Sequence, residues 1–224
     1  MKKVLFLLAV AVFFLQAPGF AQKSRVGITA GITTANMYGH VGGKDLRDAG
    51  KTGITAGLIL ETPICKSRWS FQPGLHYTQK GRILTETSDV KSWLALRYAD
   101  LHLNFLYNSK GKTTFFIGGG PTLGMDLPSY KRTKTSNATA SNLNPDPEFS
   151  ISETKIKFGK DKLDDLRGLD YGVNIMIGFR MRKGYYFAIN NTFGLRNIAP
   201  NNGTDDRIRN GCLGFRIGYL FNNK

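Results

Sequence analysis

Eight ionisable residues share one setting in this sequence, because each lies in or beside a run where small or polar residues alternate with apolar ones. They are Glu61, His76, Arg97, Asp100, His102, Asp170, Arg180 and Arg216. Acids, bases and histidines gathered on one face could perform general acid–base catalysis or hold a metal ion. The same groups could instead neutralise one another, since charges removed from water require partners.

No motif supports the catalytic interpretation. Serine, histidine and acid residues are not grouped as a nucleophile with its base, and the sequence has neither a phosphate-binding loop nor a CxxC motif. His76 and His102 could share a metal ion, but the only other histidine, His40, lies in an expected loop. We therefore predict no enzyme activity, no cofactor and no metal site. The interpretation that we favour is a charge network that fills an interior, formed by Glu61, Arg97, Asp100, Arg180 and Arg216.

The residues around these charges predict β-strands. From 169 to 181 every second residue is apolar, and 185 to 193 repeats the pattern after a tight turn at Lys183-Gly184. A period of two indicates a strand with two unlike faces, and two such runs around a short turn indicate a hairpin. The second face consists of Gly, Thr and Asn with few charges, whereas a soluble sheet would expose charge. This combination fits strands with lipid on one side and a small lumen on the other.

Eight such segments follow one another along the chain. We expect strands at 25–34, 53–61, 69–78, 94–107, 115–124, 169–181, 185–193 and 213–221. Pro73 predicts a bulge in the third strand, and a change of apolar phase near Ala99-Asp100 predicts another in the fourth. The predicted fold class is all-β, an eight-stranded antiparallel up-and-down transmembrane β-barrel.

The connections between these strands alternate in length. Long ones are expected at 38–51, 81–91, 126–168 and 196–209, and short ones at 63–68, 108–112 and 183–184. Outer-membrane barrels show this asymmetry, with long loops outside the cell and short turns in the periplasm. Within the longest connection, about 126–168, only 153–158 could extend a strand and 161–167 could form a helical turn; the rest is expected to be loop.

Aromatic residues fall toward the two ends of the expected strands. Such positions suit two girdles at the membrane–water interfaces. The predicted girdle residues are Trp69, Tyr77, Tyr107, Tyr171, Tyr185, Tyr219 and Phe221.

The beginning of the chain predicts export. Lys2 and Lys3 precede an apolar run from 4 to 15, and small residues follow at Gly19 and Ala21. This pattern is typical of a secretory signal peptide, residues 1–21, and the run is too short for a membrane anchor. Residues 22–224 would then form the barrel domain, in the outer membrane of a Gram-negative cell. The strand order separates Cys65 from Cys212, so both are expected to be free.

Several strand patterns carry a resemblance to a known family. They are 26–31 (VGITAG), 71–81 (FQPGLHYTQKG), 98–103 (YADLHL) and 118–121 (GGGP). These segments resemble the PorT-like outer-membrane β-barrel family. The resemblance implies the barrel fold and, through the family's namesake, support of protein export by the type IX secretion system.

The net charge of +15 could suggest nucleic-acid binding, but basic residues are not interleaved with aromatic ones on one exposed face. Many of them fall at the short-turn end, where anionic lipid headgroups would attract them. The expected partners are therefore outer-membrane lipids, the barrel assembly machinery and an unidentified secretion or surface protein, with no nucleic acid.

Three hypotheses for function remain. The favoured one is a non-enzymatic outer-membrane barrel with a plugged lumen and long external loops that support secretion or surface interactions. The second is a soluble, lipocalin-like periplasmic binder, whose apolar face would turn inward. The third is an outer-membrane lipid-modifying enzyme.

Overall fold

The computed structural model describes residues 24–46, 49–65, 67–137, 148–159, 161, 163–200 and 205–221. The predicted signal peptide, residues 1–21, lies outside the described residues and stays a prediction. No helix in the described part of the chain is long and apolar enough to cross a membrane.

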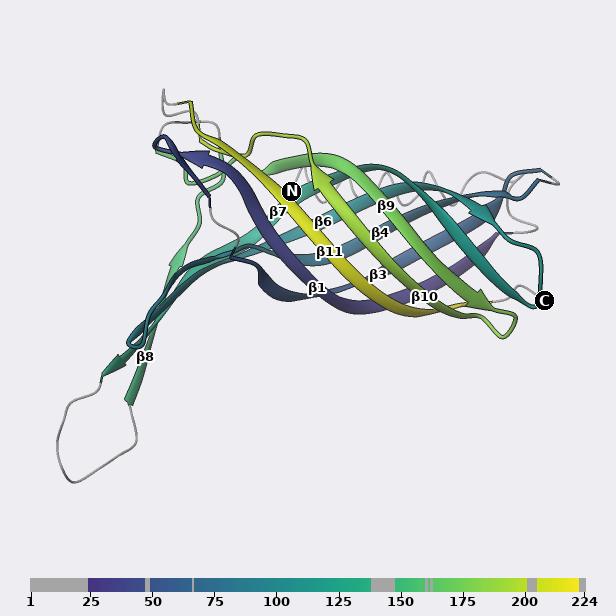
Figure 1. Ribbon diagram of the computed structural model, residues 1–224, viewed down its shortest axis with the longest axis horizontal. Helices are drawn as coiled ribbons and strands as arrows, with labels where there is room; N and C mark the ends of the chain where they lie inside the picture. Colours follow the sequence, from purple (N-terminus) through teal and green to yellow (C-terminus); the bar gives the residue numbers. More distant parts are fainter. Residues whose placement is uncertain are drawn as a thin grey trace.

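The described residues form one antiparallel sheet. Its strands are β1 (Arg25–Val41), β2 (Lys44–Asp45), β3 (Lys51–Pro63), β4 (Trp69–Lys80), β5 (Ile83–Glu86), β6 (Val90–Asn108), β7 (Thr113–Asn137), β8 (Glu148–Lys155), β9 (Leu169–Met181), β10 (Tyr185–Gly194) and β11 (Arg207–Leu220). Eight strands close into a ring in the order β1-β3-β4-β6-β7-β9-β10-β11, and β11 pairs back onto β1 (Figure 1). The predicted eight-stranded up-and-down barrel is confirmed.

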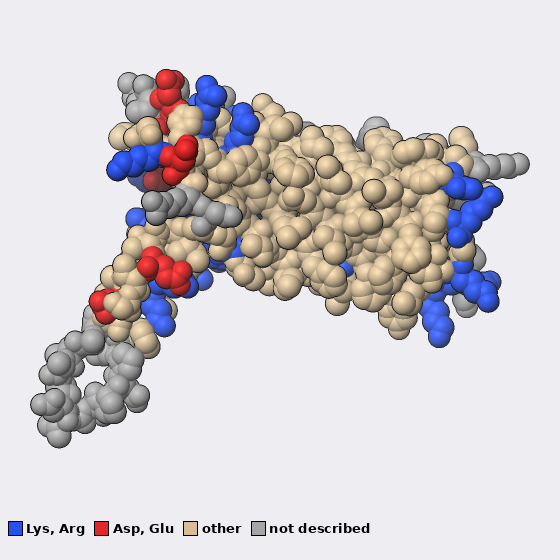
Figure 2. Space-filling view, in the orientation of Figure 1, with Lys and Arg blue, Asp and Glu red and all other residues tan. Residues whose placement is uncertain are grey.

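The two faces of the ring differ as the sequence predicts. On β1, Ile32 is 59% exposed on the outer face, and the next residue, Thr33, is 2% exposed in the lumen. The middle of the barrel carries almost no Lys, Arg, Asp or Glu on the face seen in Figure 2, whereas both ends are charged. The apolar face therefore points outward, as lipid requires. A lipocalin-like protein would need the opposite arrangement, so that alternative is wrong.

Two barrel strands continue beyond the ring at the long-loop end. β6 and β7 extend past the ring and are flanked by β5 and β8, which gives a four-stranded sheet, β5-β6-β7-β8 (Figure 1). We call this sheet, formed by residues 83–86, 90–95, 130–137 and 148–155, the arm.

The arm corrects the prediction that residues 126–168 are mainly loop. β7 continues to Asn137, and β8 returns antiparallel to it. Beyond Tyr130, β7 consists of Lys, Arg, Thr, Ser and Asn without an apolar period, and on β8 only Phe149 and Ile151 alternate with Ser. Polar pairs hold them instead, such as Ser92 Oγ to Thr133 Oγ1 at 3.1 Å and Arg132 Nε to Glu153 Oε1 at 2.8 Å. The helical turn expected at 161–167 is absent from the described residues there.

Neither predicted bulge lies where the sequence placed it. The β3–β4 register is the same at Ile59↔Gly74 and at Thr62↔Phe71, on either side of Pro73. The β4–β6 register runs unbroken past Ala99, because the apolar Leu96 and Tyr98 point into the lumen and not to lipid. A register shift does occur between β6 and β7, at Ala95/Arg97.

Candidate functional site

The lumen is the place where polar side chains of the barrel converge. Its short-turn end, which the loop lengths predict to face the periplasm, holds an ion cluster. Glu61, near the end of β3, is fully buried. Its Oε1 accepts a hydrogen bond from Arg25 Nη2 at 3.3 Å and another from Arg180 Nη1. Arg25 begins β1 opposite Glu61, and Arg180 lies near the end of β9, so three strands meet in this cluster. We call it the periplasmic ion cluster.

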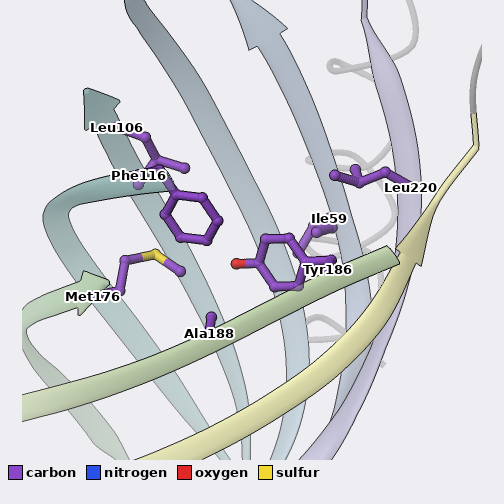
Figure 3. Packing of buried hydrophobic residues seen from close by; sticks show 7 residues of the cluster. All are labelled: Ile59, Leu106, Phe116, Met176, Tyr186, Ala188 and Leu220. Atoms are coloured by element: carbon purple, nitrogen blue, oxygen red, sulfur yellow. The ribbon is translucent and has the colours of Figure 1, made fainter. Parts of the chain in front are cut away.

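An apolar layer lies next to this cluster. Figure 3 shows its side chains converging from the surrounding strands: Ile59, Leu106, Phe116, Met176, Tyr186, Ala188 and Leu220. The rings of Phe116 and Tyr186 stack with centroids 5.4 Å apart. Gly178 makes room for this layer, because a Cβ there would lie 2.4 Å from Phe116 Cζ. We call these residues the inner apolar layer.

The middle of the lumen is polar. Asn174 donates from Nδ2 to Asn104 Oδ1 at 2.9 Å, and its own Oδ1 accepts from Asn190 and Thr192, each at 3.1 Å. Nearby, Arg216 Nη1 lies 3.2 Å from His76 Nε2. Buried polar groups bonded in this way avoid most of the cost of leaving water.

A second ion cluster occupies the part of the lumen toward the long loops. Lys80 Nζ lies 3.0 Å from Asp100 Oδ1 and 3.4 Å from Asp170 Oδ2, and Asn210 donates to the same Asp170 oxygen at 2.9 Å. All three ionised side chains are at most 5% exposed. Arg216 brings a second buried positive charge into the lumen, but it forms no ion pair with either aspartate among the described residues. We call Lys80, Asp100 and Asp170 the outer ion cluster.

The predicted network residues fall into two separate clusters. Glu61 and Arg180 belong to the periplasmic ion cluster, Asp100 to the outer one, and Arg216 contacts His76 between them. Arg97 lies elsewhere: it faces outward, with its guanidinium 5.5 Å from the centre of the Tyr130 ring. The assumed phase slip at Ala99-Asp100 had placed it inward wrongly, because residues 97 and 100 of an unbroken strand face opposite ways.

Two members of these clusters were missed from the sequence. Lys80 lies two residues beyond the expected end of its strand, although it has the inward phase of His76 and Thr78. Arg25 lies at the first position of β1, at the limit of the expected strand 25–34. In both cases continuing the period of two would have found the residue.

The outer mouth of the lumen is closed by a second apolar layer. Its members are Met37, Leu96, Tyr98, Ile156, Leu166 and Ile198. Ile156, Leu166 and Ile198 come from the connections outside the barrel strands, and Ile198 is fully buried. Backbone bonds fix that residue, since its carbonyl accepts from Arg167 N at 2.9 Å and its N–H donates to Ile208 O at 2.8 Å. We call this the outer apolar layer.

Aromatic side chains surround the outside of the barrel near its ends. At the short-turn end the ring centroids of Trp69 and Tyr107 are 5.4 Å apart, and Tyr219 lies 5.7 Å from Tyr185 and 5.3 Å from Phe221. Toward the other end, Tyr77 and Tyr171 face outward on β4 and β9. These positions are those that interfacial girdles occupy.

The described residues contain no group of three or more His, Cys, Asp or Glu placed to hold a metal ion. The rings of His76 and His102 do approach each other, with centroids 4.9 Å apart, and both are buried. Cys65 is exposed and Cys212 is buried, and both are free, as the sequence predicted.

The match to a protein family agrees with this geometry. The model of a family described as an outer membrane protein beta-barrel domain matches residues 20–199. Among solved structures, the chain is similar to Ail of Yersinia pestis, with 11% identity, a TM-score of 0.44, and coverage of 89% of this chain and 100% of that one. It is also similar to Neisserial surface protein A, with 12% identity, a TM-score of 0.42, and coverage of 88% and 97%. The N-terminal barrel of Pseudomonas aeruginosa OprF shows 11% identity, a TM-score of 0.32, and coverage of 89% and 98%.

No curated protein matches the sequence. The family match extends over most of the chain, and the closed ring with an apolar outer face is the structure that such a family requires. The chain therefore belongs to the outer membrane protein β-barrel domain family and is an integral protein of the outer membrane.

Proposed function

We propose that this protein is a non-enzymatic surface-binding barrel, in which the closed lumen anchors the arm outside the cell. The arm is the observation that supports this proposal. It extends well beyond the barrel (Figure 1), and its outermost strands, β5 and β8, have no further strand beside them among the described residues. A barrel that served only as an anchor would not need such an extension.

The arm's β8 edge suits an extended segment of a partner protein. Edge strands carry unpaired backbone N–H and C=O groups, and partner chains use these groups to add a strand. Phe149 and Ile151, which share one face of β8, are 51% and 63% exposed. Lys134 Nζ lies 3.6 Å from the centre of the Phe149 ring and supports it from β7. Backbone hydrogen bonds between β8 and the partner segment would give affinity. Pockets in the partner for the side chains of Phe149 and Ile151 would give specificity.

The closed lumen supports a binding role over a catalytic or porin role. His76, Asp100 and His102, the groups that could act as acids or bases, are 2%, 4% and 1% exposed. Apolar layers lie on both sides of them. A substrate would have to displace one of these layers to reach them.

The resemblance to the PorT-like family suggests one candidate partner, a protein of the type IX secretion system. In this proposal, the lipids of the outer membrane surround the barrel and the assembly machinery inserts it. Nucleic acid is not among the proposed partners.

The experiment places a photo-crosslinking amino acid at Phe149 in intact cells. We expect a discrete crosslinked protein that disappears when Ile151→Asp is added, because the charge would lie in the apolar part of the contact. Leu163→Asp is the matched control, since Leu163 is 89% exposed but lies outside the arm. Equal crosslinking in both variants would show that β8 is not the binding edge.

A further inference from the structure

A cavity of about 580 Å³ lies at the periplasmic end of the barrel. Seven described residues line it; four of these are basic, Arg25, Lys112, Arg180 and Arg182, and none of the seven is acidic. Its volume falls within the range of roughly 300–1,000 Å³ that is usual for small-molecule sites. On the face seen in Figure 2, this end of the molecule shows Lys and Arg and no Asp or Glu.

Two of the basic groups are held in place before any ligand arrives. Arg25 and Arg180 both bind Glu61, and their side chains are only 25% and 11% exposed. Arg25, Arg180 and Lys112 carry three positive charges against the single carboxylate of Glu61, which leaves an excess of two without counting Arg182. Fixed guanidinium groups with excess positive charge favour an anion, because little side-chain entropy remains to be lost when it binds.

Lys112 and Arg182 complete the cavity from two neighbouring strands. They directly flank the cross-strand pair Thr113↔Met181, at the ends of β7 and β9. Both side chains are exposed to solvent. The cavity thus combines a largely buried basic floor with an exposed basic entrance.

The cavity also crosses the rim of the barrel. Arg180 and Thr114 have the inward phase, whereas Met181 has the outward phase and is 41% exposed on the lipid side. The aromatic pair Tyr185–Tyr219 of the periplasmic girdle belongs to the same end. Lipid headgroups lie at the level of such girdles, so a headgroup could enter over this rim.

We propose that this cavity binds a phosphate ester. Guanidinium groups bind phosphate through paired, charge-assisted hydrogen bonds, and two of them form the floor here. The phosphate has two sources, the headgroup of an anionic phospholipid in the periplasmic leaflet or a soluble phosphate in the periplasm. This site is separate from the arm, at the opposite end of the barrel, so it does not depend on the proposed function.

The test uses the full-length folded protein in zwitterionic micelles and two probes, short-chain phosphatidylglycerol and inorganic phosphate. Arg182→Gln and Lys112→Gln remove exposed charges from the lining without touching the buried Glu61 cluster. We expect each to weaken binding roughly fivefold, the effect of about one unit of charge near an anionic group. Lys183→Gln is the matched control, because Lys183 is exposed beside Arg182 but does not line the cavity.

The pattern of binding by native mass spectrometry decides the proposal. Loss with Arg182→Gln but not with Lys183→Gln supports the site, and the probe that binds identifies lipid or free phosphate as the source. Equal loss in both variants would mean a general attraction to the basic rim and would overturn the proposal. Failure of the wild type to bind either probe would overturn it as well. Heat-modifiable migration on gels verifies that each variant is folded.

Discussion

Lys80 is the residue on which the outer ion cluster depends. It is the only cation with an ion pair to Asp100 or Asp170 among the described residues, and it contacts both. Arg216 is also buried, but the group that it contacts is the imidazole ring of His76 and not a carboxylate. Removing one partner of a buried ion pair is costly because the other charge stays buried and uncompensated. The two cations of the outer lumen should therefore differ in importance.

We predict that Lys80→Met destabilises the barrel by about 3–5 kcal/mol, since it leaves two aspartates without their direct partner. Arg216→Met should cost less, because no acidic side chain loses a direct bond. Urea unfolding of the protein in lipid vesicles measures both changes. If Arg216→Met proved the more harmful, the charge balance of the outer lumen would rest on Arg216 and our assignment of the cluster would be incorrect.

At the scale of elements, the strands inside the membrane could be predicted because lipid imposes a strict alternation. β9 and β10 match their expected bounds to within one residue, and the turn at Lys183-Gly184 lies between them. The continuation of β7 could not be predicted from 126 onward, because outside the membrane both faces of a strand are in water and no apolar period remains. The bulge near Ala99-Asp100 was predicted wrongly for a related reason. Leu96 and Tyr98 are apolar residues that close the lumen, and in the sequence such residues cannot be told from those that face lipid.

The candidate site could be predicted only in part. Inward phase identified Glu61, Asp100, Arg180 and Arg216 as lumen residues, but pairing depends on the height of each residue in the barrel. That height follows from the register between strands, for example Arg25↔Glu61 and Gln79↔Arg97, which the sequence does not specify. For this reason a single network was expected where two clusters exist.

The assignment of faces leads to a depth-dependent prediction on β10. Ile189 is 49% exposed on the outer face, midway between Tyr185 and Phe193. Relative to Ala at the same position, Ile189→Arg should cost about 2–4 kcal/mol, and Tyr185→Arg only about 0–1 kcal/mol near the interface. Unfolding in vesicles gives both values. Equal costs would mean that Ile189 is not at the centre of the membrane.

At the scale of the whole molecule, the lumen is closed twice. The inner apolar layer lies toward the short turns and the outer apolar layer lies under the long connections, with the hydrogen-bonded polar residues between them. An eight-stranded barrel has an interior just wide enough for side chains to fill. Two apolar layers in series mean that opening one of them does not open a path through the protein.

We therefore predict that the reconstituted protein shows no steady, porin-sized conductance in planar bilayers. Ile198→Ser should loosen the outer apolar layer, because it buries a hydroxyl among apolar side chains. The variant should nevertheless remain closed, since the stacked rings of Phe116 and Tyr186 still fill the other end. A porin measured in the same bilayers provides the positive control. A stable channel in the wild type would contradict the double closure, and a channel that appears only in Ile198→Ser would show that the outer layer alone seals the barrel.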